Sequence, residues 1–262
     1  NAGRRHTQSV CPVGAYQFDG LAPAVYEVFA ALQDSSASGF IELFADQDSD
    51  SASVQVMQAP PVDIEVRREG SNARADIPVK LMGRRQDMSE TEPTREIPGP
   101  HTTLAPGHWE FRAQAPPGMY VESIANYRGA PRRPWKAERV TDWYDVFIEA
   151  RSPSRIRITV SDKAGQIAGR VITGGQPVPG APVFLWPVAE SARRSLSGSL
   201  QMLSDTDGRF RFDSLPPGDY RILASFDINE IDEELIEQSR AASVHADPTQ
   251  TANIELPVWI AP

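Results

Sequence analysis

The stretch GRFRFDSLPPGDYRILA, residues 208–224, decides the fold of its part of the chain. Phe210 and Phe212 alternate with charged residues, which is the two-residue period of a strand that buries one face. Residues 215–219 combine prolines, which preset φ, with a glycine that allows positive φ, so they predict a tight corner. Tyr220 and Ile222 then share one face of a second strand. The stretch therefore predicts a strand, a corner and a returning strand.

The same pattern occurs twice more along the chain. Residues 14–30, GAYQFDGLAPAVYEVFA, align with residues 208–224 without a gap, and residues 104–113, LAPGHWEFRA, form a shorter copy. Spacings of about 80 to 110 residues are typical of tandem domains rather than of a short-period solenoid. The matched positions are Leu21, Leu104 and Leu215; Pro23, Pro106 and Pro217; Tyr26, Trp109 and Tyr220; and Ala30, Ala113 and Ala224.

Composition and turn signals predict an all-β chain with three domains. A chain of 262 residues is long enough for two or three separate cores. The 18 glycines and 23 prolines are spread along it, as expected for many strands and turns. Proline-rich residues 59–61 predict one junction and the turn at 161–165 predicts another. We therefore expect a partial β-sandwich in residues 1–60, a β-sandwich in 61–161 and a further one in 162–262.

One helix is expected among these strands. Residues 227–240 carry an apolar stripe, and Asp227 and Glu230 fit a capping box at its start. Residues 190–199 are polar and predict a loop. In the first domain, strands are expected at residues 16–18, 25–32, 40–44 and 54–57.

Charge and cysteine content exclude several classes of function. The net charge of −9 argues against a nucleic-acid or anionic-membrane partner. The single cysteine, Cys11, excludes an internal disulfide and a multi-cysteine zinc site. No apolar run is long enough for membrane insertion through a bilayer-spanning helix. The four histidines lack the spacing of a zinc-peptidase motif, and no serine lies in G-x-S-x-G. We therefore expect no enzyme activity and no cofactor.

At the C-terminal end the motifs resemble a known family. The segments GRV at residues 169–171, PVPGAPVFL at 177–185, DTDGRFRF at 205–212 and LPPGDY at 215–220 resemble the carboxypeptidase regulatory-like domain. The resemblance covers residues 165–258, extends more weakly over 104–161 and rests on one hairpin before residue 60. It implies a transthyretin-like or Ig-like Greek-key sandwich, in tandem copies as in secreted bacterial multidomain proteins. It also implies a non-catalytic, exported module, with no catalytic residues to transfer.

The expected function follows from this fold class, which is all-β tandem Greek-key sandwiches with one short helix near the C-terminus. We expect a structural and interaction protein, extracellular or at the cell surface, with the periplasm as the other compartment. The expected partners are other protein domains or copies of itself, including a homopolymer such as a filament. The alternative is a carbohydrate-binding accessory module of a secreted enzyme, with a glycan as ligand.

Two groups of aspartates have the spacing of calcium ligands. Asp46, Asp48 and Asp50 resemble the start of a calcium loop, but its sixth and twelfth positions are Ser51 and Met57. The second group is Asp205 and Asp207, which lie next to Gly208 in an Asp-Gly turn sequence. A turn is the favoured interpretation of both groups, and the metal prediction is none.

Aromatic residues supply the candidate ligand site of the alternative function. Tyr127, Trp135 and Trp143 lie in one loop-rich region, where exposed rings stack on sugars in binding modules. Packing in the core or at an edge is the favoured interpretation of the same residues.

The first domain is short on its N-terminal side. Only thirteen residues precede Gly14, whereas the last domain has about 45 residues before Gly208. An open sandwich would expose apolar faces and unpaired strand edges. Either a preceding region of a longer protein supplies the missing strands, or another chain supplies them by β-strand addition.

Overall fold

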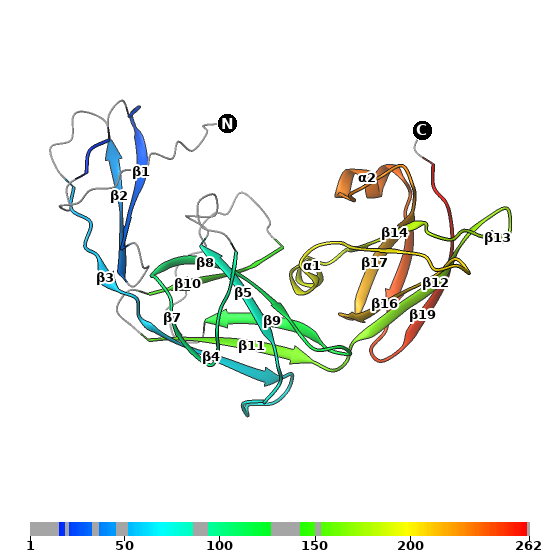
Figure 1. Ribbon diagram of the computed structural model, residues 1–262, viewed down its shortest axis with the longest axis horizontal. Coiled ribbons are helices and arrows are strands. Elements are labelled where there is room, and N and C mark those ends of the chain that lie inside the picture. The colour runs from blue at the N-terminus through cyan, green and yellow to red at the C-terminus, as the bar shows by residue number, and fades with distance from the viewer. Residues whose placement is uncertain are drawn as a thin grey trace. The chain divides into compact units, whose positions relative to one another are not determined.

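The computed structural model describes residues 16–18, 21–32, 37–45, 52–85, 94–126, 142–149 and 153–260 (Figure 1). The chain divides into two compact units, Asn1–Ala59 and Pro60–Pro262. Strands make up most of the described residues, which confirms the all-β prediction.

The first unit contains one antiparallel sheet. Its strands are β1 (Ala24–Ala31), β2 (Ala37–Ala45) and β3 (Met57–Gln58), in the order β1-β2-β3. The pairing of β1 with β2 places Val28 opposite Ile41. Two expected strands differ: residues 16–18 form no strand, and the strand expected at 54–57 is reduced to β3. A segment with alternating apolar and polar residues forms a strand only where a neighbouring strand pairs with it. In the described part of this unit no strand pairs with residues 16–18.

The second unit begins with a sandwich over residues 61–161. Its two sheets have the orders β10-β8-β5-β6 and β7-β4-β11-β9. Inward residues of both sheets, including Val62, Phe111 and Ile156, form one buried core. The strands are β4 (Pro61–Arg68), β5 (Lys80–Arg85), β6 (Arg95–Glu96), β7 (His101–Thr103), β8 (Gly107–Gln114), β9 (Tyr120–Asn126), β10 (Tyr144–Ile148) and β11 (Ser154–Ser161).

A second sandwich of the same unit follows over residues 165–257. One sheet has β12 between β16 and β19, with the short β13 against the end of β12, and the other has the order β15-β14-β17-β18. Phe210, Tyr220 and Leu256 belong to its buried core. The elements are β12 (Gly165–Thr173), β13 (Gln176–Pro177), β14 (Pro182–Pro187), α1 (Glu190–Leu196), β15 (Leu200–Leu203), β16 (Arg209–Leu215), β17 (Gly218–Ala224), α2 (Glu233–Gln238), β18 (Ala242–Ala246) and β19 (Thr251–Pro257).

The two sandwiches share a set of five strand pairs. In each, the first strand lies parallel to the last, as β4 with β11 and β12 with β19. The other matching pairs are antiparallel: β4 with β7 and β12 with β16, β5 with β8 and β14 with β17, β5 with β6 and β14 with β15, and β8 with β10 and β17 with β18. The connections differ: the first sandwich has β9 between β8 and β10, whereas the second has α2 between β17 and β18.

The helices correct two sequence predictions. Residues 190–199, expected as a loop, contain α1, which is anchored because the Arg193 guanidinium donates to the carbonyls of Pro187 and Val188. The helix expected over 227–240 is only α2. Its N-cap is Asp232, whose carboxylate accepts from the Leu235 N–H at 2.8 Å, so the predicted capping box of Asp227 and Glu230 is wrong. Ile236 of this helix, together with Ile231 just before it, packs with Phe184 and Leu223 in a cluster outside the main core.

Candidate functional site

One local structure recurs at all three copies of the sequence pattern, in residues 21–26, 104–109 and 215–220, which we call the corner. In each corner the aromatic side chain donates a hydrogen bond to the carbonyl four residues earlier. The bonds are Tyr26 Oη to Ala22 at 2.7 Å, Trp109 Nε1 to Ala105 at 2.8 Å and Tyr220 Oη to Pro216 at 2.6 Å. The alignment of the three sequence copies matched these aromatic residues but did not reveal the bond. The sequence feature that indicates the bond is an aromatic residue with a hydrogen-bond donor, Tyr or Trp, at the last position of each corner.

The three corners differ in burial. Leu104 and Leu215 are 1% and 0% exposed, whereas the matched Leu21 is 40% exposed. The aromatic donors Trp109 and Tyr220 are each 1% exposed, whereas Tyr26 is only partly buried. The corner sequence is therefore enclosed in both sandwiches of the second unit and open in the first unit.

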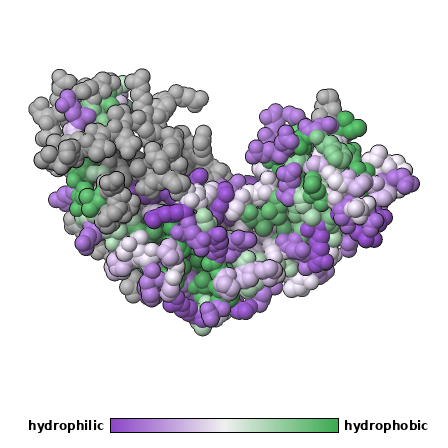
Figure 2. Space-filling view, in the orientation of Figure 1, coloured by the Kyte–Doolittle hydropathy of each residue, from purple (hydrophilic) through white to green (hydrophobic). Residues whose placement is uncertain are grey.

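The strand that follows the open corner is also incompletely covered. Among the described residues, β1 pairs with β2 alone and lies at an edge of the sheet. Val25 on β1 and Phe44 on β2 are paired across the strands and are 59% and 60% exposed. Hydrophobic residues are visible on the described part of this unit in the space-filling view (Figure 2). An edge strand with exposed apolar neighbours is a place where another strand adds.

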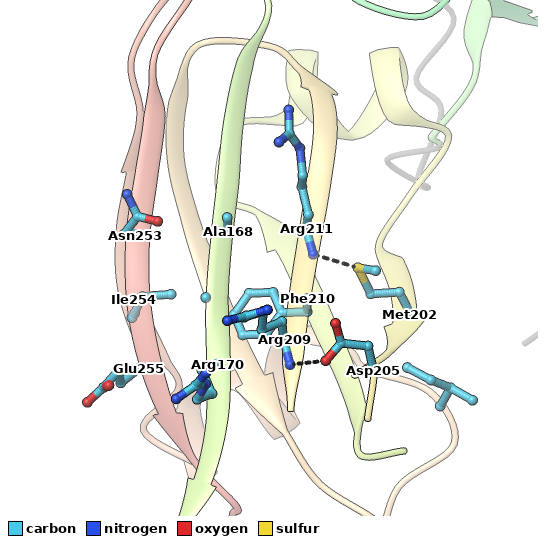
Figure 3. A pocket seen from close by; sticks show the side chains of 12 residues that line it. Ala168, Arg170, Met202, Asp205, Arg209, Phe210, Arg211, Asn253, Ile254 and Glu255 are labelled. Atoms are coloured by element: carbon cyan, nitrogen blue, oxygen red, sulfur yellow. Dashed lines mark hydrogen bonds between the residues drawn. The ribbon is translucent and has the colours of Figure 1, made fainter. Parts of the chain in front are cut away.

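A second candidate site is a shallow groove of about 670 Å³ on the last sandwich, beside β16 (Figure 3). The edge of β16 that borders this groove is already occupied by side chains. The Arg209 N–H donates to Asp205 Oδ1 at 2.7 Å, and the Arg211 N–H lies 3.3 Å from Met202 Sδ. These contacts use the backbone groups that an added strand would need, so this edge differs from that of β1.

The charges of the groove are largely neutralised by neighbouring side chains. Arg209 lies 3.2 Å from Asp207, and Arg211 bonds to Asp213 at 2.7 Å. Arg170 is opposite Arg209 in the β12–β16 register, and Glu255 is its neighbour on β19. Paired arginines and carboxylates offer a polar contact surface, and they do not form a nucleophile activated by a base.

Asp205 and Asp207, the calcium candidates of this region, lie in the turn before β16. Asp205 Oδ1 accepts from the N–H groups of Asp207 and Arg209, at 2.9 and 2.7 Å, which is the geometry of an aspartate that closes a turn. Gly208, at the end of the turn, has φ of +72°. In the described part of the chain, no group of three or more His, Cys, Asp or Glu residues is arranged to hold a metal ion.

Trp143 is the one aromatic candidate that the structure describes. Its side chain is 7% exposed, and the guanidinium carbons of Arg84 and Arg112 lie 4.3 and 3.9 Å from its ring centroid. Arg84 also donates to Glu110 at 2.7 Å. Burial lowers the pKa of Arg112, and the charge of Arg84 adds to that effect. Trp143 therefore packs in a buried cation–π cluster.

The remaining predicted site residues, Tyr127, Trp135, Asp46, Asp48 and Asp50, lie outside the described residues. The glycan and calcium hypotheses for them stay predictions.

Three histidines pair with aspartates across strands, a feature that the sequence motifs did not reveal. His101 lies 2.8 Å from Asp63, and His245 lies 2.6 Å from Asp219. The bond to Asp219 raises the pKa of His245. His108 lies 3.4 Å from Asp145. All of these pairs are exposed, and they support strand pairing.

The helices in the described ranges, α1 and α2, are both too short to cross a membrane.

The comparison with solved structures finds proteins of low similarity. A minor pilin of Streptococcus agalactiae has 10% identity and a TM-score of 0.34, over 78% of this chain and 98% of that one. A streptococcal ancillary pilin has 13% identity and a TM-score of 0.32, over 91% and 76%. A protein described as a putative carbohydrate binding protein of Pseudomonas aeruginosa has 15% identity and a TM-score of 0.23, over 36% and 88%. At these scores the likenesses carry no argument about function.

No curated protein matches the chain. A family profile does match, over the last sandwich, where the GRV, PVPGAPVFL and LPPGDY segments fall on β12, on β13 to β14 and on the corner between β16 and β17. Residues 166–257 match the carboxypeptidase regulatory-like domain, the family that these motifs resemble.

Proposed function

We propose that this chain is a non-catalytic extracellular structural and interaction protein built of tandem β-sandwich modules, as a stalk, surface or fibre component. The observation that carries the proposal is the difference among the three corners. The enclosed corners belong to sandwiches with buried cores. The open corner belongs to a sheet in which β1 is an edge strand among the described residues, and an edge strand is the feature that binds an added strand.

The connection within the second unit supports the spacer role. Only residues 162–164 separate β11 from β12. Lys163 Nζ lies 2.8 Å from Glu69 Oε1, and Arg68 lies 2.9 Å from Asp162, so the connection is tied to the turn after β4. Flexible linkers are longer and bond less to their neighbours. This connection is suited to modules that keep a fixed order along a stalk.

The interaction role is assigned to the first unit. Exposed strand edges are prone to aggregation unless they are short, blocked or paired. The edge of β16 is blocked by Asp205 and Met202. The eight-residue β1 is long for an edge strand, which favours pairing with a strand that joins it in the assembled protein.

The extracellular assignment rests on the family match of residues 166–257. The resemblance implies exported modules that accompany other domains, and a module without a catalytic ligand set fits a role in assembly.

The test is to purify the protein from its native source and to measure its intact mass and its assembly state by size-exclusion light scattering. Backbone hydrogen exchange of β1, β8 and β17 is measured on the same sample and on the 262-residue chain alone. We expect β1 to exchange faster than β8 and β17 in the chain alone, and to be protected in a native form that is heavier than 28.8 kDa or assembled. A native monomer of 28.8 kDa, with β1 protected as well as β8 and β17, would contradict the proposal.

A further inference from the structure

The two sandwiches of the second unit indicate which strand fits beside β1, whose edge away from β2 pairs with no strand among the described residues. The alignment of the corners matches β1 with β8 and β17. β2 pairs antiparallel with β1, as β10 does with β8 and β18 with β17. The other neighbour is β5 in one sandwich and β14 in the other, and both are antiparallel to the strand that follows the corner. The edge of β1 away from β2 is therefore the position of a β5- or β14-type strand.

The register of that strand follows from the same comparison. Ala113 is paired with Leu81, and the matched Ala224 is paired with Val183. All four side chains are buried, so a branched aliphatic residue covers the small alanine in both sandwiches. The matched alanine of β1 is Ala30.

The next inward pair shows how side-chain size is balanced. Phe111 is paired with Gly83, where an added Cβ would lie 2.9 Å from the Phe111 ring. Ile222, which is smaller than phenylalanine, is paired with Leu185. Core volume is conserved when a large residue faces a small one and two medium residues face each other. Val28 occupies the matched position of β1, so its partner is a residue of leucine size.

The outer face of the added strand has a different requirement. On β14 the outward Phe184 is buried beneath α2. On the first unit the outward residues Val25 and Phe44 are more than half exposed. A strand that pairs with β1 therefore needs apolar residues only at alternate, inward positions.

We propose that β1 is the acceptor for one donor strand, antiparallel to it, with a branched aliphatic residue opposite Ala30 and a leucine-sized residue opposite Val28. This inference rests on the proposed function, because it names the partner of the interaction module. The donor pairs its backbone with the edge of β1 away from β2, and its inward side chains cover the face that carries Tyr26.

The test uses the full chain and a synthetic donor peptide. The peptide has the sequence of residues 180–189 with Phe184→Thr and Trp186→Lys, so it keeps Val183 and Leu185 inward and gains solubility. We expect it to slow hydrogen exchange of β1 by at least about tenfold, with β8 and β17 unchanged. A control peptide that also carries Val183→Asp and Leu185→Asp has the same length and backbone, and it is expected to leave β1 unchanged.

A swap of residue sizes tests the register. The chain variant Val28→Phe should bind the first peptide about tenfold more weakly, because two large side chains then meet. A peptide with Leu185→Gly should restore that binding, as Gly83 accommodates Phe111 in the middle sandwich. Equal binding of both peptides by the variant and the parent chain would overturn the register.

The remaining outcomes separate this inference from the proposed function. If β1 exchanges fast in the chain alone and neither peptide protects it, the donor assignment is wrong, while the structural role stands on its own test. If β1 becomes protected without peptide as the concentration rises, two copies pair edge to edge and the donor assignment is again wrong. If β1 is protected in the dilute chain, both proposals fail.

Discussion

Replacing Tyr220 with phenylalanine should destabilise the second unit by removing one buried hydrogen bond. The Tyr220 hydroxyl donates to the Pro216 carbonyl at 2.6 Å, and Tyr220 is 1% exposed. The substitution keeps the ring and its packing but leaves the carbonyl of a buried residue without its donor. An unsatisfied buried acceptor costs about 1 to 3 kcal/mol of unfolding free energy. Tyr26→Phe removes the same bond from the open corner of the first unit, so it controls for effects that do not arise in the second unit.

Urea unfolding followed by tryptophan fluorescence measures this effect. All five tryptophans lie between residues 109 and 259, so the signal reports the second unit alone. We expect Tyr220→Phe to lower the urea midpoint at an unchanged slope, by an amount that corresponds to a loss of about 1 to 3 kcal/mol of unfolding free energy. Tyr26→Phe should leave this transition within about 0.5 kcal/mol of the parent chain. A Tyr220→Phe effect below about 0.5 kcal/mol would refute the argument that burial gives the corner bond its value.

Three further results are expected. Burial raises the pKa of Tyr144 to about 12, so the folded state holds the phenol proton where the unfolded chain releases it. Its contribution to stability should be complete below about pH 10 and decline above it, and Tyr144→Phe should flatten the alkaline part of the urea-midpoint profile. Gly169→Ala would place a Cβ against the backbone oxygen of Ile254 on β19, and should lower the unfolding free energy by at least about 1 to 3 kcal/mol. The control Ala168→Ser, at the adjacent position, should change the unfolding free energy by less than about 0.5 kcal/mol. Asp219→Asn should lower the raised pKa of His245 in an NMR titration, because the bond to Asp219 is the main cause of the raised value. The stabilising pair exists below that pKa and is lost as the pH rises through it. An unchanged pKa of His245 would contradict the bond as its cause.

The features that sequence analysis missed depend on side-chain contacts that no residue pattern showed. Helix α1 looked like a polar loop because its anchor, Arg193, bonds carbonyls at the end of β14. Trp143 looked like a ligand candidate because the arginines that lie over its ring come from β5 and β8. The Arg193 bonds are local but follow no recurring residue pattern, whereas the Trp143 contacts join parts of the chain that are distant in sequence.

The sequence by itself determined the alternating strands, the all-β class and the three copies of the corner. These features depend on short-range geometry: a two-residue period, proline and glycine in the turn, and a ring that reaches a carbonyl four residues away. Only the tertiary structure decided which corners are buried, since Leu215 is covered by strands remote in the chain and Leu21 is 40% exposed. Burial depends on which strands pair across long loops, so the same local sequence encloses a core in one module and leaves an open edge in another.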